Sequence, residues 1–394
     1  MVNVTAALSF CLVANLISLM TFPAVLPQAS QAWGLSASEA GWIGSIYFAG
    51  YAAAVPILAG ATDRIDGRWI VAGGSLLGAA ASAAFALIDG QVWLALMIRF
   101  LGGVALAGVH MPGLNLLSER LEGTTQTRGA ALYTSSYAIG SAGSFLISGA
   151  VEAWFGWRAV FVAGAIGPLL ALVAVLLVSA APPRRAPAAP PAQRFASVWR
   201  NRPFMAYAVG FAGNTWEVFA IRVWFVACLA WTLSLPGNAV DLPNLALLAG
   251  VASLAGVPAS IAVAELSARN RRAEAIVLVC AISVATCLAL AATVGGNVWI
   301  VLTLLMLLQI LSFADVGALG AGAVAHAAPA SRGAALAIYA LGGFTTGFVG
   351  PALVGLVLDA FGGVDSPAGW TAAFLVMALG STVAGFAVWT TRRR

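Results

Sequence analysis

The chain has 394 residues, of which 61% are hydrophobic and 8% are charged. Because a soluble domain usually has about a quarter of its residues charged, this composition excludes an ordinary soluble domain and predicts an all-α protein that crosses a membrane many times. The net charge of +5 comes from arginine alone among the basic residues, and its distribution does not indicate a nucleic-acid partner. The cysteines lie in apolar runs without a CxxC pair, so no metal framework or disulfide is indicated.

A membrane-spanning helix needs about 20 consecutive, mostly apolar residues. Such segments, separated by glycine, proline and charged residues, recur along the whole chain and predict about twelve transmembrane helices. Their expected ranges are 5–27, 38–60, 69–88, 92–118, 130–151, 158–179, 204–233, 244–265, 274–294, 298–325, 334–358 and 370–390. The N-terminus lacks the basic start of a secretion signal, so its first apolar run is expected to remain as the first helix.

The positions of the loop arginines are consistent with this topology. When the predicted helices cross the membrane in alternation, every loop arginine except Arg158 falls on one side. Basic residues favour cytoplasmic loops. We therefore expect a multi-pass protein of the bacterial inner (plasma) membrane with both termini in the cytoplasm.

The longest break between predicted helices is rich in proline and arginine, and predicts a semi-extended linker. It divides the chain into a six-helix bundle at 1–180, a cytoplasmic linker at 181–203 and a second six-helix bundle at 204–394. Matching residues in the two bundles indicate a duplication. The pentapeptide Arg-Gly-Ala-Ala-Leu at 128–132 recurs at 332–336, for example. Parallel six-helix repeats are typical of transporters, with the substrate site between them.

The loop after the second predicted helix reads Ala-Gly-Ala-Thr-Asp-Arg-Ile-Asp-Gly-Arg at 59–68. With this loop and its six-plus-six arrangement, the chain resembles the major facilitator superfamily (MFS) along its whole length. Asp63, Arg64 and Arg68 take the charged positions of the family signature G-x-x-x-D-R-x-G-R-R/K, while the glycines are displaced by one residue. The resemblance implies that these three residues form a conformational switch, in which ion pairs break as the two halves move.

Two further stretches are similar to parts of this family. Arg99 followed by Gly102 and Gly103 resembles a second family signature in the fourth helix. In the fifth helix, Ser144 stands where the antiporter signature has a proline, which does not favour an efflux antiporter. The segment 216–224 is similar to members grouped with cyanate and nitrate permeases.

Ionisable side chains deep in a membrane helix are costly, and they are candidate functional residues for that reason. The deep set consists of Arg99, His110, Glu217, Arg222 and Asp315. The resemblance implies that the first, fourth, seventh and tenth helices line a central cavity, while the third, sixth, ninth and twelfth face lipid. All five deep residues lie on predicted cavity-lining helices. The other acids, which include Glu152 and Asp359, lie at helix ends or in loops and are expected to be solvated.

Guanidinium groups suit carboxylates and oxyanions, so Arg99 and Arg222 are predicted to bind an anionic substrate. Glu217, Asp315 and His110 are the predicted proton-coupling groups, with His110 and Asp315 as a possible pair across the lower cavity. Structural alternatives stay open, namely packing roles for Arg99 and His110 and a static Glu217–Arg222 ion pair. On a straight helix Glu217 and Arg222 lie about 140° apart. The remaining predicted substrate-binding residues are Asn15, Asn214, Trp216 and Trp224, besides Glu217 itself.

These features predict a secondary active transporter that moves a small organic anion by alternating access, coupled to protons. No nucleotide-binding motif, HExxH or GxSxG sequence is present, so neither a nucleotide-driven pump nor an intramembrane enzyme is predicted. The alternatives are proton-coupled efflux of cationic or amphipathic compounds and, with less support, divalent metal transport through His110, Asp315 and Glu217. We expect a monomer without cofactor, bound metal or nucleic acid, whose partners are its solute, protons and membrane lipid.

Overall fold

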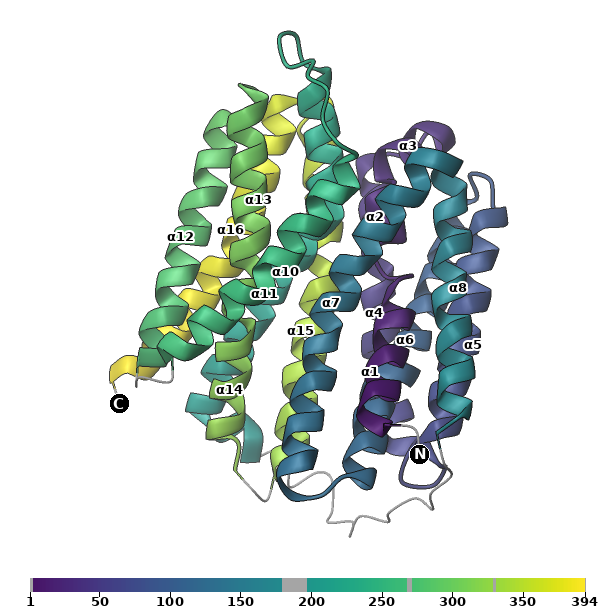
Figure 1. Ribbon diagram of the computed structural model, residues 1–394. Helices are drawn as coiled ribbons and strands as arrows, with labels where there is room; N and C mark the ends of the chain where they lie inside the picture. Colours follow the sequence, from purple (N-terminus) through teal and green to yellow (C-terminus); the bar gives the residue numbers. More distant parts are fainter. Residues whose placement is uncertain (1–2, 179–196, 268–270, 329–330, 394) are drawn as a thin grey trace. The chain divides into compact units, whose positions relative to one another are not determined.

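The computed structural model describes residues 3–178, 197–267, 271–328 and 331–393. Within these ranges the regular secondary structure is helical and contains no strand (Figure 1). Eleven helices in the described part are long and apolar enough to cross a membrane, and the apolar helix α1 is shorter. The predicted all-α membrane fold is therefore confirmed, and the helix pattern is consistent with twelve spans.

The helices and their bounds are α1 (Val4–Leu16), α2 (Thr21–Ala24), α3 (Leu26–Trp33), α4 (Ala37–Ala61), α5 (Gly67–Leu87), α6 (Val92–Arg120), α7 (Gly123–Phe155), α8 (Trp157–Leu176), α10 (Arg202–Ser234), α11 (Leu245–Leu266), α12 (Arg272–Thr293), α13 (Val298–Ala314), α14 (Val316–His326), α15 (Arg332–Ala360), α16 (Pro367–Trp389) and the short 3-10 helix Thr390–Arg393.

Two helices predicted to be continuous are broken. The predicted helix 5–27 ends at Leu16 as α1, and the short helices α2 and α3 follow it. The predicted helix 298–325 divides at Asp315, which ends α13 and begins α14. The predicted continuity of the first helix is wrong. The second helix is interrupted at Asp315, although residues 298–326 still count as one of the eleven candidate membrane spans. Hydropathy does not reveal such breaks, because backbone groups freed inside a membrane protein can be satisfied by neighbouring helices.

The described residues form two compact units. Unit 1 contains the described residues of 3–34, 46–178 and 243–251, and unit 2 contains those of 35–45, 197–242 and 252–393. In unit 1, α5 packs against α6 and α8, and α1 packs against α7 and α8; in unit 2, α10 packs against α15 and α16 (Figure 1). Most of the predicted linker lies outside the described residues, and the division at 181–203 remains a prediction.

Glycine allows close helix crossings inside each unit. In unit 1, a Cβ atom on Gly103 of α6 would collide with the backbone of Tyr47 in α4. In unit 2, a Cβ atom on Gly213 of α10 would collide with the carbonyl oxygen of Gly380 in α16. Small residues at membrane-helix interfaces permit this backbone approach. Gly103, about one helical turn after Arg99, therefore lets α4 come close enough to place the Tyr47 ring beside the guanidinium.

Candidate functional site

The break after α1 is stabilised by Arg99 of α6. Its Nη1 donates to the carbonyl oxygen of Ser18 at 3.5 Å, and its Nη2 donates to that of Leu19 at 3.2 Å. Pro23 has no N–H with which to bond Leu19 in a continuous helix. The guanidinium also lies 4.8 Å from the centroid of the Tyr47 ring. Arg99 is only 5% exposed, and it places positive charge at the carbonyl end of a helix, where the helix dipole favours it.

Ser144 of α7 stabilises the same break from another helix. Its hydroxyl oxygen accepts a hydrogen bond from the N–H of Met20 at 2.9 Å and donates one to the carbonyl of Ile17 at 2.6 Å. A proline at this position could make neither hydrogen bond. The departure from the antiporter signature at Ser144 therefore has a structural consequence, because this residue satisfies both a donor and an acceptor of the unwound segment.

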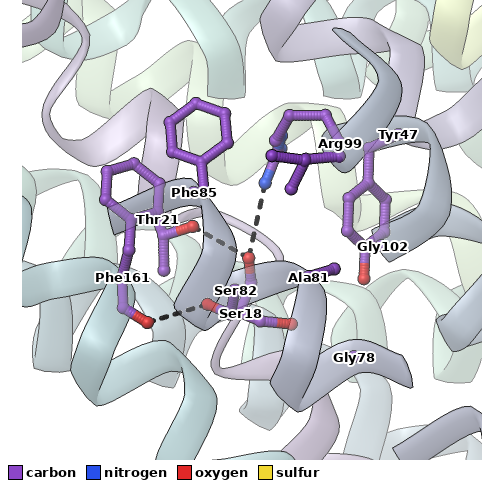
Figure 2. Close-up of a pocket in the computed structure, with 11 residues that line it drawn as sticks. Ser18, Thr21, Tyr47, Gly78, Ala81, Ser82, Phe85, Arg99, Gly102 and Phe161 are labelled. Carbon is purple, nitrogen blue, oxygen red and sulfur yellow. Dashed lines mark hydrogen bonds between the residues drawn. The ribbon is translucent and has the colours of Figure 1, made fainter. Parts of the chain in front are cut away.

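A cavity of about 20 Å³ adjoins Arg99 and has room for roughly one water molecule (Figure 2). Figure 2 shows the guanidinium directed at Ser18, whose carbonyl also accepts a hydrogen bond from Thr21 at 2.9 Å. On the other side of the cavity the Ser82 hydroxyl donates to the carbonyl of Phe161 at 2.9 Å. The lining of the cavity is mostly apolar with a few polar groups, and the cavity is too small for an organic solute. The geometry thus gives Arg99 a direct role on the backbone of the break.

Asn15 lies between helices rather than in this cavity. Its Nδ2 donates to the carbonyl of Cys11 at 2.8 Å and to the hydroxyl of Ser75 in α5 at 3.0 Å. The residue is 4% exposed. Asn15 therefore joins α1 to α5, and the structure does not bring it to the cavity beside Arg99.

His110 of α6 lies among three tyrosines of unit 1. Its Nδ1 is 2.8 Å from the Tyr51 hydroxyl, and its ring centroid is 5.3 Å from that of Tyr137 and 6.4 Å from that of Tyr133. The Tyr133 hydroxyl also donates to the backbone carbonyl of His110 at 2.9 Å. The imidazole itself is half-buried. This aromatic cluster, made of His110, Tyr51, Tyr133 and Tyr137, combines flat apolar surfaces with polar groups fixed by hydrogen bonds.

In unit 2, Glu217 of α10 faces α12 and α16. Its Oε1 accepts a hydrogen bond from the Ser283 hydroxyl at 2.6 Å and lies 3.9 Å from the Cys287 sulfur, while its Oε2 accepts one from Ser381. Glu217 is fully buried. Sequence reasoning found Glu217 but missed these partners, because α12 and α16 were expected to face lipid and hydroxyls in apolar helices attract little notice.

Asp315 occupies the break between α13 and α14. Its Oδ1 accepts a hydrogen bond from Nδ2 of Asn214 at 2.7 Å, and the same nitrogen donates to the carbonyl of Ser312 at 2.8 Å. Its Oδ2 lies 3.6 Å from the Cys280 sulfur. Asn214 precedes Glu217 by about one turn of α10. Glu217 and Asn214, the hydrogen-bond partner of Asp315, therefore lie on neighbouring turns of α10.

We call the two buried acids Glu217 and Asp315, together with the polar side chains around them, the acid seam. Its members are Asn214, Glu217, Cys280, Ser283, Asp315 and Ser381. The donors described here are hydroxyl, thiol and amide groups, all of them uncharged. Among the described residues, no three His, Cys, Asp or Glu side chains gather closely enough to hold a metal ion.

Arg222 points toward α13. Its guanidinium carbon lies 5.6 Å from the centroid of the Phe313 ring, and the residue is 2% exposed. Glu217, on the same helix, contacts α12 and α16. The two charged groups of α10 thus contact different neighbours, as their angular separation around the helix predicts.

The two tryptophans predicted to bind substrate attach α10 to its neighbours. The indole N–H of Trp216 donates to the carbonyl of Val376 in α16 at 3.0 Å. That of Trp224 donates to the carbonyl of Pro351 in α15, also at 3.0 Å. Trp224 is fully buried, whereas Trp216 is half-buried. Of the two, only Trp216 therefore retains exposed ring surface.

The loop between α4 and α5 contains the predicted switch residues. Asp66 caps α5 by accepting a hydrogen bond from the N–H of Arg68 at 3.0 Å, and its carboxylate lies 3.8 Å from the Arg68 side chain. Arg68 also donates to the carbonyl of Val178 at 3.3 Å. Asp63 and Arg64 are exposed in the loop. The cap at Asp66, where the family has a glycine, was missed, although an aspartate just before a helix is a recognised N-cap signal.

Several known proteins are similar in sequence to this chain. The niacin transporter NiaP of Acinetobacter baylyi is 31% identical over 143 residues, which are 36% of this chain and 32% of that protein. Spinster homolog 1 of Homo sapiens is 23% identical over 239 residues, 57% of this chain and 45% of that protein. The chain thus matches about a third and under half of these two relatives. An uncharacterized MFS-type transporter of Mycobacterium tuberculosis is 27% identical over 323 residues, with 80% and 69% covered.

Solved structures share the fold. A bacterial homolog of the human lysosomal transporter Spinster, in an inward-facing and unoccupied conformation, has a TM-score of 0.81 at 15% identity, covering 99% of this chain and 97% of that one. The nucleoside transporter NupG has a TM-score of 0.76 at 14% identity and is matched over its full length. At these identities the likeness concerns the fold alone. The family model described as Major Facilitator Superfamily matches residues 8–323, and the chain therefore belongs to the major facilitator superfamily.

Proposed function

We propose that this transporter couples protons to the movement of a small organic anion. Membership of the superfamily supplies the transport activity. We infer the coupling ion and the solute class from the residues described above.

The acid seam is the observation that carries the coupling. Glu217 and Asp315 are 0% and 1% exposed, and their hydrogen bonds come from the uncharged groups described above. A buried carboxylate without a cationic partner is costly, and binding a proton removes that cost. Glu217 and Asp315 are therefore the proposed proton carriers.

Two features of the chain support an anionic solute. Arg222 places a guanidinium deep in unit 2, and guanidinium groups bind carboxylates in a matching planar geometry. The aromatic cluster around His110 in unit 1, which includes the half-buried ring of Tyr137, suits the flat organic part of such a solute. The half-buried ring of Trp216 in unit 2 offers a similar surface. The relative from Acinetobacter baylyi is named a niacin transporter. Niacin is an aromatic carboxylate and is therefore the first solute to test.

The structure also favours an indirect role for Arg99 and Asn15 in transport. Arg99 stabilises the break after α1, and Asn15 joins α1 to α5. In transporters, broken helices commonly lie at the substrate site, where the chain can change conformation. These two residues would therefore act by holding the first helix in shape.

Orientation and switching complete the proposal. The arginine distribution supports a protein of the bacterial inner membrane with both termini on the cytoplasmic side. The protein is proposed to act as a monomer. Asp63, Arg64 and Arg68 lie in or next to the loop that would be cytoplasmic, where they would form ion pairs in one conformation and release them in another.

Uptake into proteoliposomes tests the function. An acidic exterior should drive accumulation of niacin or benzoate, whereas nicotinamide, which is neutral and similar in shape, should not accumulate. Arg222→Gln should abolish this uptake, and the exposed Arg158→Gln should not change it. Protein-free liposomes correct for passive entry of protonated acids. Accumulation of organic amines when the lumen is acidic, without accumulation of carboxylates when the exterior is acidic, would overturn the anion assignment. It would favour proton-coupled efflux of cationic compounds, which the acid seam could also serve.

A further inference from the structure

Gln309 of α13 is a buried polar side chain, only 1% exposed. Its Nε2 donates to the hydroxyl of Ser253 in α11 at 2.7 Å, and this hydrogen bond fixes the plane of the amide. The other end of the amide differs, because Oε1 has no hydrogen-bond partner among the residues that the structure describes. Buried polar atoms in native proteins nearly always have a partner, so an exception of this kind calls for an explanation.

The Gln309 amide lies one helical turn from the ring beside the Arg222 guanidinium. Phe313 follows Gln309 by four residues, so the two side chains are neighbours on one face of α13, with Cβ atoms about 5–6 Å apart. The same face packs against α11, where a Cβ atom on Gly256 would lie 3.0 Å from the Cβ of Phe313. The guanidinium carbon of Arg222 is 5.6 Å from the centroid of the Phe313 ring. All of these residues belong to unit 2, and a single small solute could touch both Gln309 and Arg222.

These three side chains suit three different parts of a solute. The Arg222 guanidinium suits a carboxylate. The Phe313 ring is half-buried and keeps exposed surface for contact with a flat ring. The Oε1 of Gln309 can only accept a hydrogen bond, so its partner must be a donor such as a hydroxyl or amino group. Together they match an aromatic carboxylate that has a hydrogen-bond donor on its ring.

The break at Asp315 offers a way for this part of α13 to open. Gln309 and Arg222 are buried in this conformation, so a solute reaches them only after the helix moves. Broken helices commonly lie at transporter substrate sites, where the chain can change conformation. Ser312 links the break to Gln309, because its hydroxyl donates to the Gln309 carbonyl at 2.9 Å while its own carbonyl accepts from Asn214 at 2.8 Å. Movement at the break would therefore shift the turn that contains Gln309.

We propose that Gln309 is a specificity-determining residue, whose amide oxygen accepts a hydrogen bond from a ring hydroxyl or amino group of the aromatic carboxylate that Arg222 binds. This inference rests on the proposed function for the anionic solute, and it adds the second group by which that solute is recognised. It accounts for the unpartnered oxygen, because the hydrogen bond forms only when solute is bound. One uncharged hydrogen bond changes a ratio of affinities by about two- to tenfold.

Competition for the uptake of labelled benzoate into proteoliposomes tests this proposal. The competitors are 3- and 4-hydroxybenzoate and the corresponding fluorobenzoates, which are similar in size but have no donor on the ring. In the natural protein, the better hydroxy compound should halve benzoate uptake at a concentration about two- to tenfold lower than its fluoro analogue. Gln309→Met keeps the length of the side chain without the amide and should lose this preference. Asn238→Ala is the matched control and should keep it, because the buried Asn238 amide of unit 2 already accepts from the N–H of Val298 at 3.1 Å.

Equal inhibition by the hydroxy and fluoro compounds in the natural protein would overturn this inference, while benzoate uptake would still support the proposed function. A preference that persists in Gln309→Met would equally overturn it, because another residue would then bind the hydroxyl. Absence of any benzoate uptake would instead refute the proposed function, and this inference with it. If Gln309→Met does not fold, Gln309→Leu removes the same amide with a good helix former and should lose the preference in the same way.

Discussion

Arg99 should contribute more to stability than an exposed arginine with similar contacts. Replacing Arg99 with methionine keeps most of the buried stem but removes the hydrogen bonds to Ser18 and Leu19 and the contact with the Tyr47 ring. It leaves the two carbonyls without this donor. One good charge-assisted hydrogen bond, one long one and a buried cation–π contact together amount to about 3 kcal/mol.

Arg158 provides the matched control in the same unit. It donates to the carbonyl of Ile88 at 3.1 Å and to Asp89 at 2.6 Å, and lies 4.9 Å from the Trp157 ring centroid. Its side chain is, however, 43% exposed. Exposed ion pairs contribute about 0–1 kcal/mol. Arg158→Met should therefore cost less than Arg99→Met by a few kcal/mol.

Two measurements check this difference. Unfolding of the detergent-solubilised variants, followed by denaturant titration, gives the free energies to be compared. Hydrogen–deuterium exchange should rise at residues 17–21 in the Arg99 variant and stay unchanged there in the Arg158 variant. Equal losses of stability, or unchanged exchange at 17–21, would refute the idea that Arg99 stabilises the break.

Two further substitutions probe the polar contacts of unit 1. Ser144→Pro should lower the unfolding free energy by about 2–4 kcal/mol, because it removes both hydrogen bonds to the break and a helix-interior N–H. Ser144→Ala removes the hydroxyl alone and should cost less in a denaturant titration. Equal losses in the two variants would contradict a contribution from the missing N–H. Tyr51→Phe removes the hydroxyl bonded to His110 and should cost about 1 kcal/mol or less in the same titration, while uptake assays should show a raised KM for the solute. An unchanged KM would contradict a contact between the solute and the aromatic cluster around His110.

The helices were predictable because the bilayer fixes the length and composition of a spanning segment. The break after α1 was not, since it depends on Arg99 and Ser144, which are far away in the sequence. Pro23 was the available local signal, because it cannot donate an N–H to Leu19. Hydropathy averages over such a residue and so predicts one uninterrupted helix.

The candidate site was predictable where burial is costly. The cost of a charge in the membrane singled out Glu217 and Asp315, and the structure places both in the acid seam. Their partners Ser283 and Cys280 were missed, because small polar residues are tolerated in apolar helices. Asp359 was expected to be a solvated helix end, since nothing local shows that its carboxylate caps α4.

Substrate-induced proton movement tests the central claim most directly. In proteoliposomes with a pH-sensitive dye in the lumen, adding external niacin or another transported carboxylate should acidify the lumen. Glu217→Gln should abolish this proton signal while still exchanging internal for external solute. A Glu217→Gln variant that carries protons as the natural protein does would contradict the assignment of proton coupling to the acid seam.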